Sequence, residues 1–285
     1  MRTYRLRDAA GSLPASQTID YGTALNESQL KAVETLEGPV LVVAGAGTGK
    51  TRTLVYRVAH LVTRGIPPEQ ILLLTFTRKS AEEMLRRASA LLDGRCDRVQ
   101  GGTFHSVAYL ILRKYGQLLG YSPTFTIMDR SDAEDVLQLL RGRLGLSDKE
   151  KRFPRKNTLA DILSKSVNRQ EPLESILSDE YPHFSHYLDD LVRLQAEYAS
   201  FKQEKSMLDY DDLLVKLTEL LGRHEDVRER LSQRYRYILV DEYQDTNKVQ
   251  AAIIRLLASS HDNVMVVGDD AQSIYSFRGA TFRNI

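Results

Sequence analysis

Short apolar runs alternate with amphipathic stretches towards both ends of the chain. Residues 39–44 and 71–76 are apolar or β-branched, and each run is followed by a polar loop and a helical pattern. Such runs are typical of strands in a parallel sheet that is covered on both faces. Two more strand-like runs, residues 237–240 and 263–267, follow near the other end. This alternation predicts an α/β fold with a parallel sheet.

Polar residues mark the expected helix starts. Asn26 precedes an amphipathic stretch and is followed three residues later by Gln29, and Ser80 has the same relation to Glu83. This spacing is that of a capping box, in which two side chains satisfy free backbone N–H groups. Residues 1–24 show neither helical nor strand periodicity, so we expect a flexible or loosely packed leader there.

The middle of the chain has a different pattern. Residues 104–221 show helical periodicity and hardly any strand-like run. We therefore expect a sheet domain formed by the first and last parts of the chain and interrupted by an inserted helical domain. The predicted limits are residues 25–107 and 209–285 for the sheet domain and residues 108–208 for the insertion.

The composition is that of an ordinary globular protein. With 42% hydrophobic and 27% charged residues among 285, disordered and collagen-like chains are excluded. The longest uncharged apolar run, residues 39–49, is far shorter than the roughly 20 residues that cross a bilayer, so we expect no membrane partner. A single cysteine, Cys96, allows no internal disulfide, and we expect it to be inert in a cytoplasmic protein.

The overall charge does not by itself indicate a nucleic-acid partner. Lys and Arg number 39 against 38 Asp and Glu, which gives a formal net charge of +1. Such a partner therefore needs a local basic surface. Residues 141–169 hold nine Lys and Arg against three Asp and Glu, a net charge of +6. The alternative for this stretch is a solvated face with no partner.

A glycine-rich loop follows the first predicted strand. The segment Ala44-Gly45-Ala46-Gly47-Thr48-Gly49-Lys50-Thr51 lies between a strand and a helix, which is the context of a phosphate-binding P-loop. Glycines let backbone N–H groups converge on phosphate oxygens, and the positive end of the helix adds to the attraction. Lys50 can then reach the β- and γ-phosphates, and Thr51 can ligate Mg²⁺. The segment departs from the general pattern only in Ala44, where Gly is usual.

Two acidic residues end the third strand-like run. Asp241 and Glu242 directly follow residues 237–240. Hydrolysis of a nucleotide needs a second metal anchor and a group that positions water, both at the end of another strand of the same sheet. Asp241 is thus the candidate Mg²⁺ ligand, and Glu242 is the candidate base that orients and deprotonates the attacking water.

These motifs resemble those of superfamily 1 DNA helicases of the UvrD/Rep/PcrA family. The similarity covers the N-terminal half of that family, a RecA-like P-loop domain with an inserted helical domain. The family's own P-loop also begins with Ala, which favours this family over other P-loop proteins. The resemblance implies that Gln29, in Leu25-Asn26-Glu27-Ser28-Gln29, reads the adenine edge and that Arg52 packs near the base and sugar. The predicted nucleotide-binding residues are Gln29, Gly45, Ala46, Gly47, Thr48, Gly49, Lys50, Thr51, Arg52 and Gln272.

Three further segments resemble the family's contacts to single-stranded DNA. They are Thr75-Phe76-Thr77-Arg78-Lys79-Ser80-Ala81, Gly102-Thr103-Phe104-His105-Ser106, and residues 267–280. Arg78 stands where the family usually has Asn, and Phe277 stands where it usually has Trp. The segment Leu208-Asp209-Tyr210-Asp211-Asp212-Leu213-Leu214 is similar to the one that leads back into the first domain. The DNA contacts implied in this way are Phe76, Thr77, Arg78, Thr103, Phe104, His105, Tyr275 and Phe277.

Aromatic chemistry supports the same interpretation independently. Proteins bind single strands without sequence preference by stacking bases on aromatic rings, and this chain has no Trp, so Phe and Tyr must serve. Phe76, Tyr275 and Phe277 lie just beyond predicted strands, at the edge where α/β sheets bind ligands. The alternative for each ring is a place in the core. For His105 the alternative is a hydrogen bond at a helix start rather than an acid role.

Gln272 links the two expected ligands. If residues 267–280 follow the family, the Gln272 amide senses the γ-phosphate while Tyr275 and Phe277 contact DNA. This makes Gln272 a candidate catalytic residue together with Lys50 and Glu242. The alternative is that its amide only satisfies backbone groups of its own loop.

The implied function is ATP- and Mg²⁺-dependent movement on single-stranded DNA, in a 3′-to-5′ helicase of repair or replication. Single strands and single/double-strand junctions are the expected partners. Two alternatives stay open: a helicase–nuclease subunit of the RecB/AddA type, and a nucleotide-gated DNA-binding module without turnover. In the family, arginines of a second RecA-like domain complete the ATP site. We expect this chain by itself to bind ATP weakly and to hydrolyse it negligibly.

Overall fold

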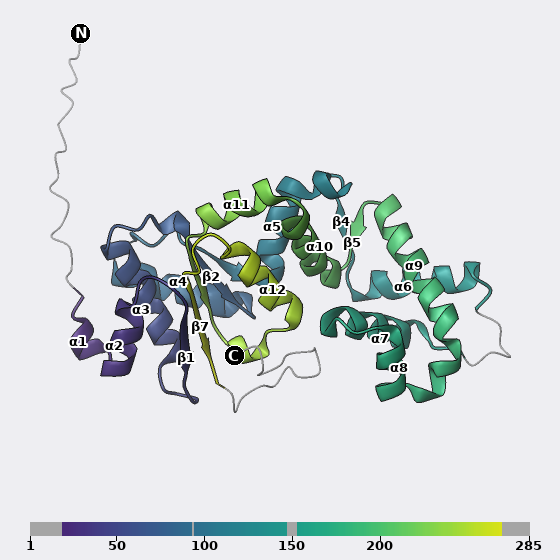
Figure 1. The fold of residues 1–285 in the computed structure, drawn as a ribbon, viewed down its shortest axis with the longest axis horizontal. Coiled ribbons are helices and arrows are strands. Elements are labelled where there is room, and N and C mark those ends of the chain that lie inside the picture. The colour runs from purple at the N-terminus through teal and green to yellow at the C-terminus, as the bar shows by residue number, and fades with distance from the viewer. Residues whose placement is uncertain (1–18, 93, 147–152, 270–285) are drawn as a thin grey trace, which may run out of the picture.

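The computed structural model describes residues 19–92, 94–146 and 153–269, shown as the coloured ribbon in Figure 1. The strands are β1 (Val40–Val43), β2 (Ile71–Thr75), β3 (Gln100–Thr103), β4 (Thr126–Ile127), β5 (Met207–Leu208), β6 (Tyr237–Val240) and β7 (Val264–Gly268). The α-helices are α1 (Tyr21–Ala24), α2 (Glu27–Glu34), α3 (Lys50–Thr63), α4 (Arg78–Leu91), α5 (Phe104–Tyr115), α6 (Arg130–Arg143), α7 (Lys156–Arg169), α8 (Leu173–Glu180), α9 (Leu188–Glu204), α10 (Tyr210–Arg223), α11 (Glu225–Arg234) and α12 (Lys248–Leu257). Short 3-10 helices are η1 (Pro68–Gln70), η2 (Gly116–Leu119), η3 (Pro182–Tyr187) and η4 (Tyr243–Asp245).

The main sheet confirms the predicted α/β class. Within the described residues it has five strands in the order β1-β7-β6-β2-β3, and every pairing is parallel. β1 pairs with β7 and β2 pairs with β6, so the two ends of the chain form one sheet. All carboxyl ends therefore lie at one edge. That edge carries the loops after β1, β2 and β6, and Asp269, which directly follows β7.

β3 is a strand that the hydrophobic pattern did not predict. Its sequence is Gln-Gly-Gly-Thr, which contains no apolar run. The glycines have a packing reason, because a Cβ at Gly101 would lie 2.9 Å from Leu85 Cδ1 on α4. Close approach of the helix, rather than burial of a large side chain, thus determines this part of the sequence.

Coverage of β1 differs from the expectation for a strand buried on both faces. Leu41 is 49% exposed and Val43 is 52% exposed, whereas every residue of β2 and β6 is buried. β1 lies at the edge of the sheet order, and only its Val40 and Val42 pack against a core cluster. The expectation of two covered faces is therefore wrong for β1 among the described residues.

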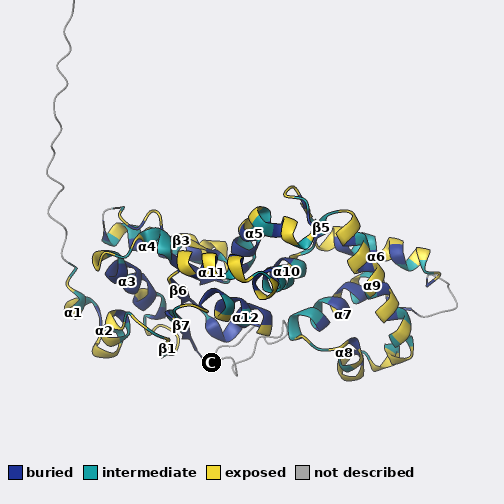
Figure 2. Ribbon diagram, turned by 45° about the horizontal axis from the view of Figure 1, so that its top comes forward, coloured by how far each residue is buried: buried dark blue, intermediate teal, exposed yellow. Residues whose placement is uncertain are grey.

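Alternate residues of the central strands enter two different cores. Leu72 and Leu74 pack with α5, α10 and α12, and Ile71 and Leu73 pack with α3 and α4. This is the two-residue period of a strand that is buried on both sides. Figure 2 shows the buried residues as a dark blue interior between these helices.

The helices α6 to α9 have a hydrophobic core of their own. This core includes Leu137, Leu159, Leu163, Leu191 and Leu194. In Figure 1 these helices lie on the right, away from the main sheet. The small strands β4 and β5 pair where the chain enters and leaves them.

The predicted boundary between residues 107 and 108 falls inside α5. Ile111 and Leu112 of this helix pack in the core of the sheet. We therefore propose that the inserted unit begins after η2, and we keep residue 208 as its proposed end.

The helix starts confirm one expected cap and correct the other. At α2, Gln29 N donates to Asn26 Oδ1 (2.9 Å) and Asn26 N donates to Gln29 Oε1 (3.1 Å), the predicted capping box. α4 is capped by Thr77, which accepts from Ser80 N at 3.1 Å, so the predicted cap by Ser80 with Glu83 is wrong. The helix begins earlier because Thr77 also has a side-chain oxygen and takes the extended conformation that a cap requires.

The predicted leader divides into two parts. Residues 1–18 lie outside the described residues, whereas Tyr21–Ala24 form α1. The ring of Tyr21 packs edge-on against Tyr56 and His60 of α3, with centroids 6.1 and 5.2 Å apart. Among the described helices none has the length and apolarity that a membrane span needs.

Candidate functional site

The glycine-rich loop leads from β1 directly into α3. Gly47 and Gly49 have φ angles of 73° and 90°, a conformation that costs little only for glycine. A Cβ at Gly49 would also lie 2.9 Å from Gln29 Nε2. Inside the loop, Thr48 Oγ1 donates to Gly45 O at 2.7 Å. The loop thus presents the N-terminus of a long helix to the sheet edge, as a phosphate site requires.

Lys50, the first residue of α3, is oriented toward the end of β7. Its Nζ lies 3.3 Å from Asp269 Oδ2, and the two residues are only 8% and 3% exposed. A buried ammonium at a helix N-terminus is unfavourable unless anions approach it, because both carry positive charge. The position of Lys50 is therefore that of an anion-binding group, with Asp269 as its carboxylate partner in this structure.

Thr51 and Asp241 bring two oxygen ligands together. Thr51 Oγ1 donates to Asp241 Oδ2 at 3.4 Å, and Asp241 is 3% exposed at the end of β6. Burial, together with the charge of Glu242, raises the pKa of Asp241 to about 6. A cation beside Asp241 would stabilise the ionised carboxylate that burial and Glu242 disfavour. A hydroxyl and a carboxylate are the oxygen donors that Mg²⁺ takes while keeping several waters, so these residues fit that ion.

Glu242 is held by a residue that the sequence analysis did not single out. Gln244 Nε2 donates to Glu242 Oε2 at 2.7 Å, and Gln244 Oε1 accepts from Asp269 N at 2.9 Å. Glu242 itself has φ 50°, a left-handed conformation that is uncommon outside glycine. Gln244 is 2% exposed and joins the ends of β6 and β7. Its position two residues after Glu242 is the one sequence signal that pointed to it.

Gln29 contacts the P-loop in this structure. Its Nε2 donates to Thr48 O at 2.8 Å, while its Oε1 accepts from Asn26 N in the capping box. The adenine-reading role stays a prediction. Arg52 lies on the exposed side of α3 with its guanidinium carbon 5.5 Å from the ring centroid of Tyr56. Gln272, Tyr275 and Phe277 lie outside the described residues.

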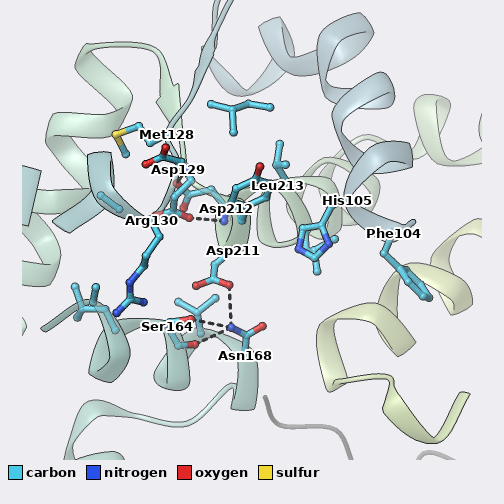
Figure 3. A pocket seen from close by; sticks show the side chains of 18 of the residues that line it. Phe104, His105, Met128, Asp129, Arg130, Ser164, Asn168, Asp211, Asp212 and Leu213 are labelled. Carbon is cyan, nitrogen blue, oxygen red and sulfur yellow. Dashed lines mark hydrogen bonds between the residues drawn. The ribbon is translucent and has the colours of Figure 1, made fainter. Parts of the chain in front are cut away.

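A large cleft lies between the sheet domain and the inserted helices, and its lining includes Asp245 and Asn247, which follow Glu242 in the chain. It has a volume of about 1360 Å³ and is lined by Phe76, Arg78, Thr103, Phe104 and His105, which are predicted DNA contacts. Figure 3 shows Phe104 and His105 on one side of the cleft and Arg130 and Asn168 on the other. The structure therefore brings together residues from two predicted DNA segments, whereas Thr77 serves as the cap of α4.

The aromatic residues of the cleft differ in exposure. Phe104 is 2% exposed and packs edge-on against Phe76, with centroids 6.3 Å apart, so it supports the half-buried Phe76 ring. Tyr210 at the start of α10 is 54% exposed, and its ring lies 6.0 Å from that of His105. Sequence analysis missed Tyr210, although it stands in the segment that leads back into the sheet domain.

The charges near the cleft change the expectation for the basic stretch. Lys156 pairs with Asp135 at 2.6 Å, and Lys165 and Arg169 both pair with Glu180. Residues 147–152 lie outside the described part, so the stretch is tested only in part.

Arg78 is exposed at the first turn of α4, where a cation is unfavourable for the helix.

Comparison with known proteins agrees with the arrangement of these motifs. Residues 25–285 match the family model described as the UvrD/REP helicase N-terminal domain. The chain is 38% identical over 264 residues to the ATP-dependent DNA helicase PcrA of Leuconostoc citreum, covering 92% of this chain and 34% of that protein.

Two other relatives carry the same name. PcrA of Bacillus subtilis (strain 168) is 36% identical over 266 residues, and PcrA of Staphylococcus aureus (strain Mu50) is 35% identical over 262 residues; in both pairs 92% of this chain and 35% of the relative are covered. The chain thus spans about a third of the length of these relatives. The match over residues 25–285 and these identities show that the chain belongs to the UvrD/Rep helicase family and corresponds to its N-terminal domain.

Proposed function

We propose that this chain is the ATP- and DNA-binding portion of an ATP-dependent DNA helicase. The observation that carries the proposal is the meeting of three strand ends at one edge of the sheet. There the P-loop Lys50, the pair Asp241 and Glu242, and Asp269 lie within one hydrogen-bonded group. The relatives named ATP-dependent DNA helicase support the same function.

The chain's residues have distinct roles in this proposal. The P-loop N–H groups and Lys50 bind the phosphates, and Lys50 exchanges Asp269 for the γ-phosphate. Thr51 and Asp241 hold Mg²⁺, which neutralises charge that develops on the phosphoryl oxygens. Glu242, oriented by Gln244, takes a proton from the attacking water. Gln29 and Arg52 hold the base and sugar, and Gln272 senses the γ-phosphate.

The cleft is the proposed path of single-stranded DNA. Phe76 and Tyr210 offer ring surface at its wall, and Arg78 supplies a cation at its edge. Bases that stack on such rings are bound with little sequence preference. Tyr275 and Phe277 are proposed to extend this surface. The proposal also includes three properties that the sequence implies. They are movement in the 3′-to-5′ direction, binding at single/double-strand junctions and residence in the cytoplasm.

Phosphate release with and without an oligo-dT strand, measured on this chain joined to a second RecA-like domain of the family, tests the proposal. A helicase domain with its partner domain hydrolyses ATP faster when DNA is present, since DNA binding and the ATP site are linked. A gated binding module would bind Mg·ATP and DNA but release no phosphate. Absence of binding to both ligands would contradict the proposed function.

A further inference from the structure

The side chain of Asn168, on α7, makes hydrogen bonds to two other helices. Asn168 Nδ2 donates to Asp211 Oδ1 at 2.9 Å, and Asn168 Oδ1 accepts from Asn247 Nδ2 at 2.9 Å. Within its own helix, Asn168 Nδ2 also donates to Ser164 O at 2.9 Å. Figure 3 shows the Asn168 side chain pointing toward Asp211, with a dashed line that marks this hydrogen bond. One neutral side chain therefore connects the inserted helix α7 with the starts of α10 and α12.

Asn247 is tied closely to the nucleotide site. It caps α12 by accepting from Gln250 N at 2.9 Å with its Oδ1, so only its Nδ2 is directed to Asn168. Asn247 is 6% exposed and follows Glu242 by five residues. Both ends of its amide are thus used, one for the helix and one for α7.

The turn between Glu242 and Asn247 is short and internally bonded. Asp245 N donates to Glu242 O at 2.9 Å, and Thr246 N donates to Tyr243 O at 3.0 Å. Thr246 Oγ1 also donates to Tyr243 O at 2.6 Å. A displacement of Glu242 is therefore carried to Asn247 rather than absorbed by a loose loop.

A second connection between the inserted helices and α10 has a different character. Lys202 of α9 is 7% exposed and pairs with Asp209 at 2.7 Å and with Asp212. Tyr198 adds a hydrogen bond to Asp209 at 2.9 Å. Bonds between charged groups are stronger than neutral ones, so this connection is the fixed one. The Asn168 side chain is neutral, so each of its contacts has at most one charged partner, and it lines the cleft, where water can replace these contacts.

We propose that Asn168 is a positioning residue that couples occupancy of the nucleotide site to the inserted helices lining the cleft. This inference rests on the proposed function. Motion at Glu242 shifts Asn247, and the Asn168 bridge transfers the shift to α7, while Lys202 keeps α9 attached to α10. A residue that only stabilised the fold would change both ligand affinities together and leave their coupling unaltered.

A donor–acceptor exchange tests this with matched variants. Asn168→Asp places a carboxylate against Asp211 and removes the donated bond. The double variant Asn168→Asp with Asp211→Asn restores the bond with its direction reversed. In the single and in the double variant, Asn247 Nδ2 can still donate to the side chain at position 168. Asn157→Asp makes the same change at an exposed position of the same helix and serves as control.

The measurement is the affinity for a labelled oligo-dT strand with and without Mg²⁺ and a non-hydrolysable ATP analogue. By thermodynamic linkage, the ratio of the two affinities, which is the factor by which the nucleotide changes the affinity for DNA, equals the factor by which DNA changes the affinity for the nucleotide. We expect a ratio of about fivefold or more in the wild-type chain, since couplings of that size are usual. Asn168→Asp should bring the ratio close to one, and the double variant and Asn157→Asp should keep the wild-type ratio.

Three results would overturn the inference. A wild-type ratio of one would show that the two sites are not coupled in this chain. An unaltered ratio in Asn168→Asp would show that coupling does not pass through Asn168, and a failure of the double variant to recover would show that the bridge itself is not responsible. If the wild-type chain binds neither ligand, the proposed function fails first and this inference with it.

Discussion

Lys50 and Asp269 form a buried ion pair that joins the P-loop to the end of β7, with 3.3 Å between Nζ and Oδ2. The pair puts the cation that is proposed to bind phosphate directly beside the strand that leads into residues 270–285. A nucleotide phosphate must compete with Asp269 for this ammonium. The two ends of the sheet domain are therefore linked through the same group that is proposed to bind ATP.

Lys50→Ala should remove binding of Mg·ATP and also destabilise the chain. The variant takes a cation away from a carboxylate that is 3% exposed, and loss of one partner of a buried pair costs about 3–5 kcal/mol. The double variant Lys50→Ala with Asp269→Asn should recover much of the stability without recovering nucleotide binding. Urea unfolding with and without Mg·ATP separates the two effects. Equal stabilisation of wild type and Lys50→Ala by Mg·ATP would show that the P-loop is not the site.

Glu242→Gln and Gln244→Leu should both slow hydrolysis while Mg·ATP still binds. The amide at 242 cannot take a proton, and general-base catalysis contributes about 10²–10⁴ in rate. Gln244→Leu keeps the base but removes the hydrogen bond that orients it, so we expect a smaller loss of about tenfold, or 1.4 kcal/mol of barrier. The measurement is DNA-stimulated phosphate release by this chain joined to a second RecA-like domain of the family, together with nucleotide affinity. Wild-type rates in Gln244→Leu would show that Glu242 needs no such support.

The two carboxylates beside Lys202 should respond to pH with opposite signs. Burial and the charge of Asp209 raise the pKa of Asp212 to about 6. Burial opposes ionisation of Asp209 as well, but Lys202 and several hydrogen bonds outweigh it and lower the Asp209 pKa. The folded chain therefore holds a proton on Asp212 more tightly than the unfolded chain does, and less tightly on Asp209.

The contribution of Asp212 to stability consequently falls as the pH rises from about 4 to 6, where the folded chain loses this proton. The contribution of Asp209 is present above its unfolded pKa and is lost as the pH falls below it. Asp212→Asn should flatten the free energy of unfolding between pH 4 and about 6.5, and Asp209→Asn should not. Chemical unfolding at several pH values provides the comparison. A steeper curve for Asp212→Asn would reverse the assignment.

Sequence patterns predicted the sheet because its central strands are buried on both faces. β2 and β6 are continuous apolar runs for that reason. The hydrophobic pattern did not predict β3, because its glycines are required by the close approach of α4. The exposed face of β1 was not predictable either, because a strand's place at the sheet edge depends on strand order. Strand order is set by tertiary packing, so it cannot be predicted from the pattern of hydrophobic residues along the chain.

The site was predictable to the extent that its residues stand in spaced motifs. Lys50, Thr51, Asp241 and Glu242 meet as expected because all follow parallel strands. Tyr210 and Asn168 contact partners that are distant in sequence, so no short spacing marks them. Gln244 stands only two residues after Glu242, but its second partner, Asp269, is distant in sequence. The charge count of residues 141–169 had a similar limit, since it could not show that Lys156, Lys165 and Arg169 already pair with acidic residues of other helices.

Arg78 and Lys156 should differ in the salt dependence of DNA binding. Arg78 is exposed at the rim of the cleft and forms no ion pair with the described residues, whereas Lys156 pairs with Asp135. Each phosphate contact on a single strand contributes about 0.7 to the slope of log affinity against log salt. Arg78→Ala should therefore lower that slope by about 0.7, and Lys156→Ala should leave it unaltered. A drop in slope for Lys156→Ala alone would restore the basic stretch as the phosphate-binding surface.

Tyr210→Ala should weaken binding of single strands with little dependence on base sequence. The ring is 54% exposed in the cleft and its edge contact with His105 holds it at the wall, so stacking on a base requires little rearrangement. Loss of a stacked base costs about 1–3 kcal/mol. Tyr210→Phe should bind nearly as tightly as wild type, because the stacking surface is kept.

Leu110→Ala provides the matched control, since Leu110 is 66% exposed on α5, the same helix that carries His105, but does not line the cleft. Fluorescence anisotropy measures the affinities of the wild-type chain and the three variants for labelled oligo-dT and oligo-dA strands. Stacking predicts parallel losses on both strands for Tyr210→Ala and none for Leu110→Ala. A loss that Tyr210→Phe shares would assign the effect to the hydroxyl group, and equal affinities throughout would place the DNA outside this cleft.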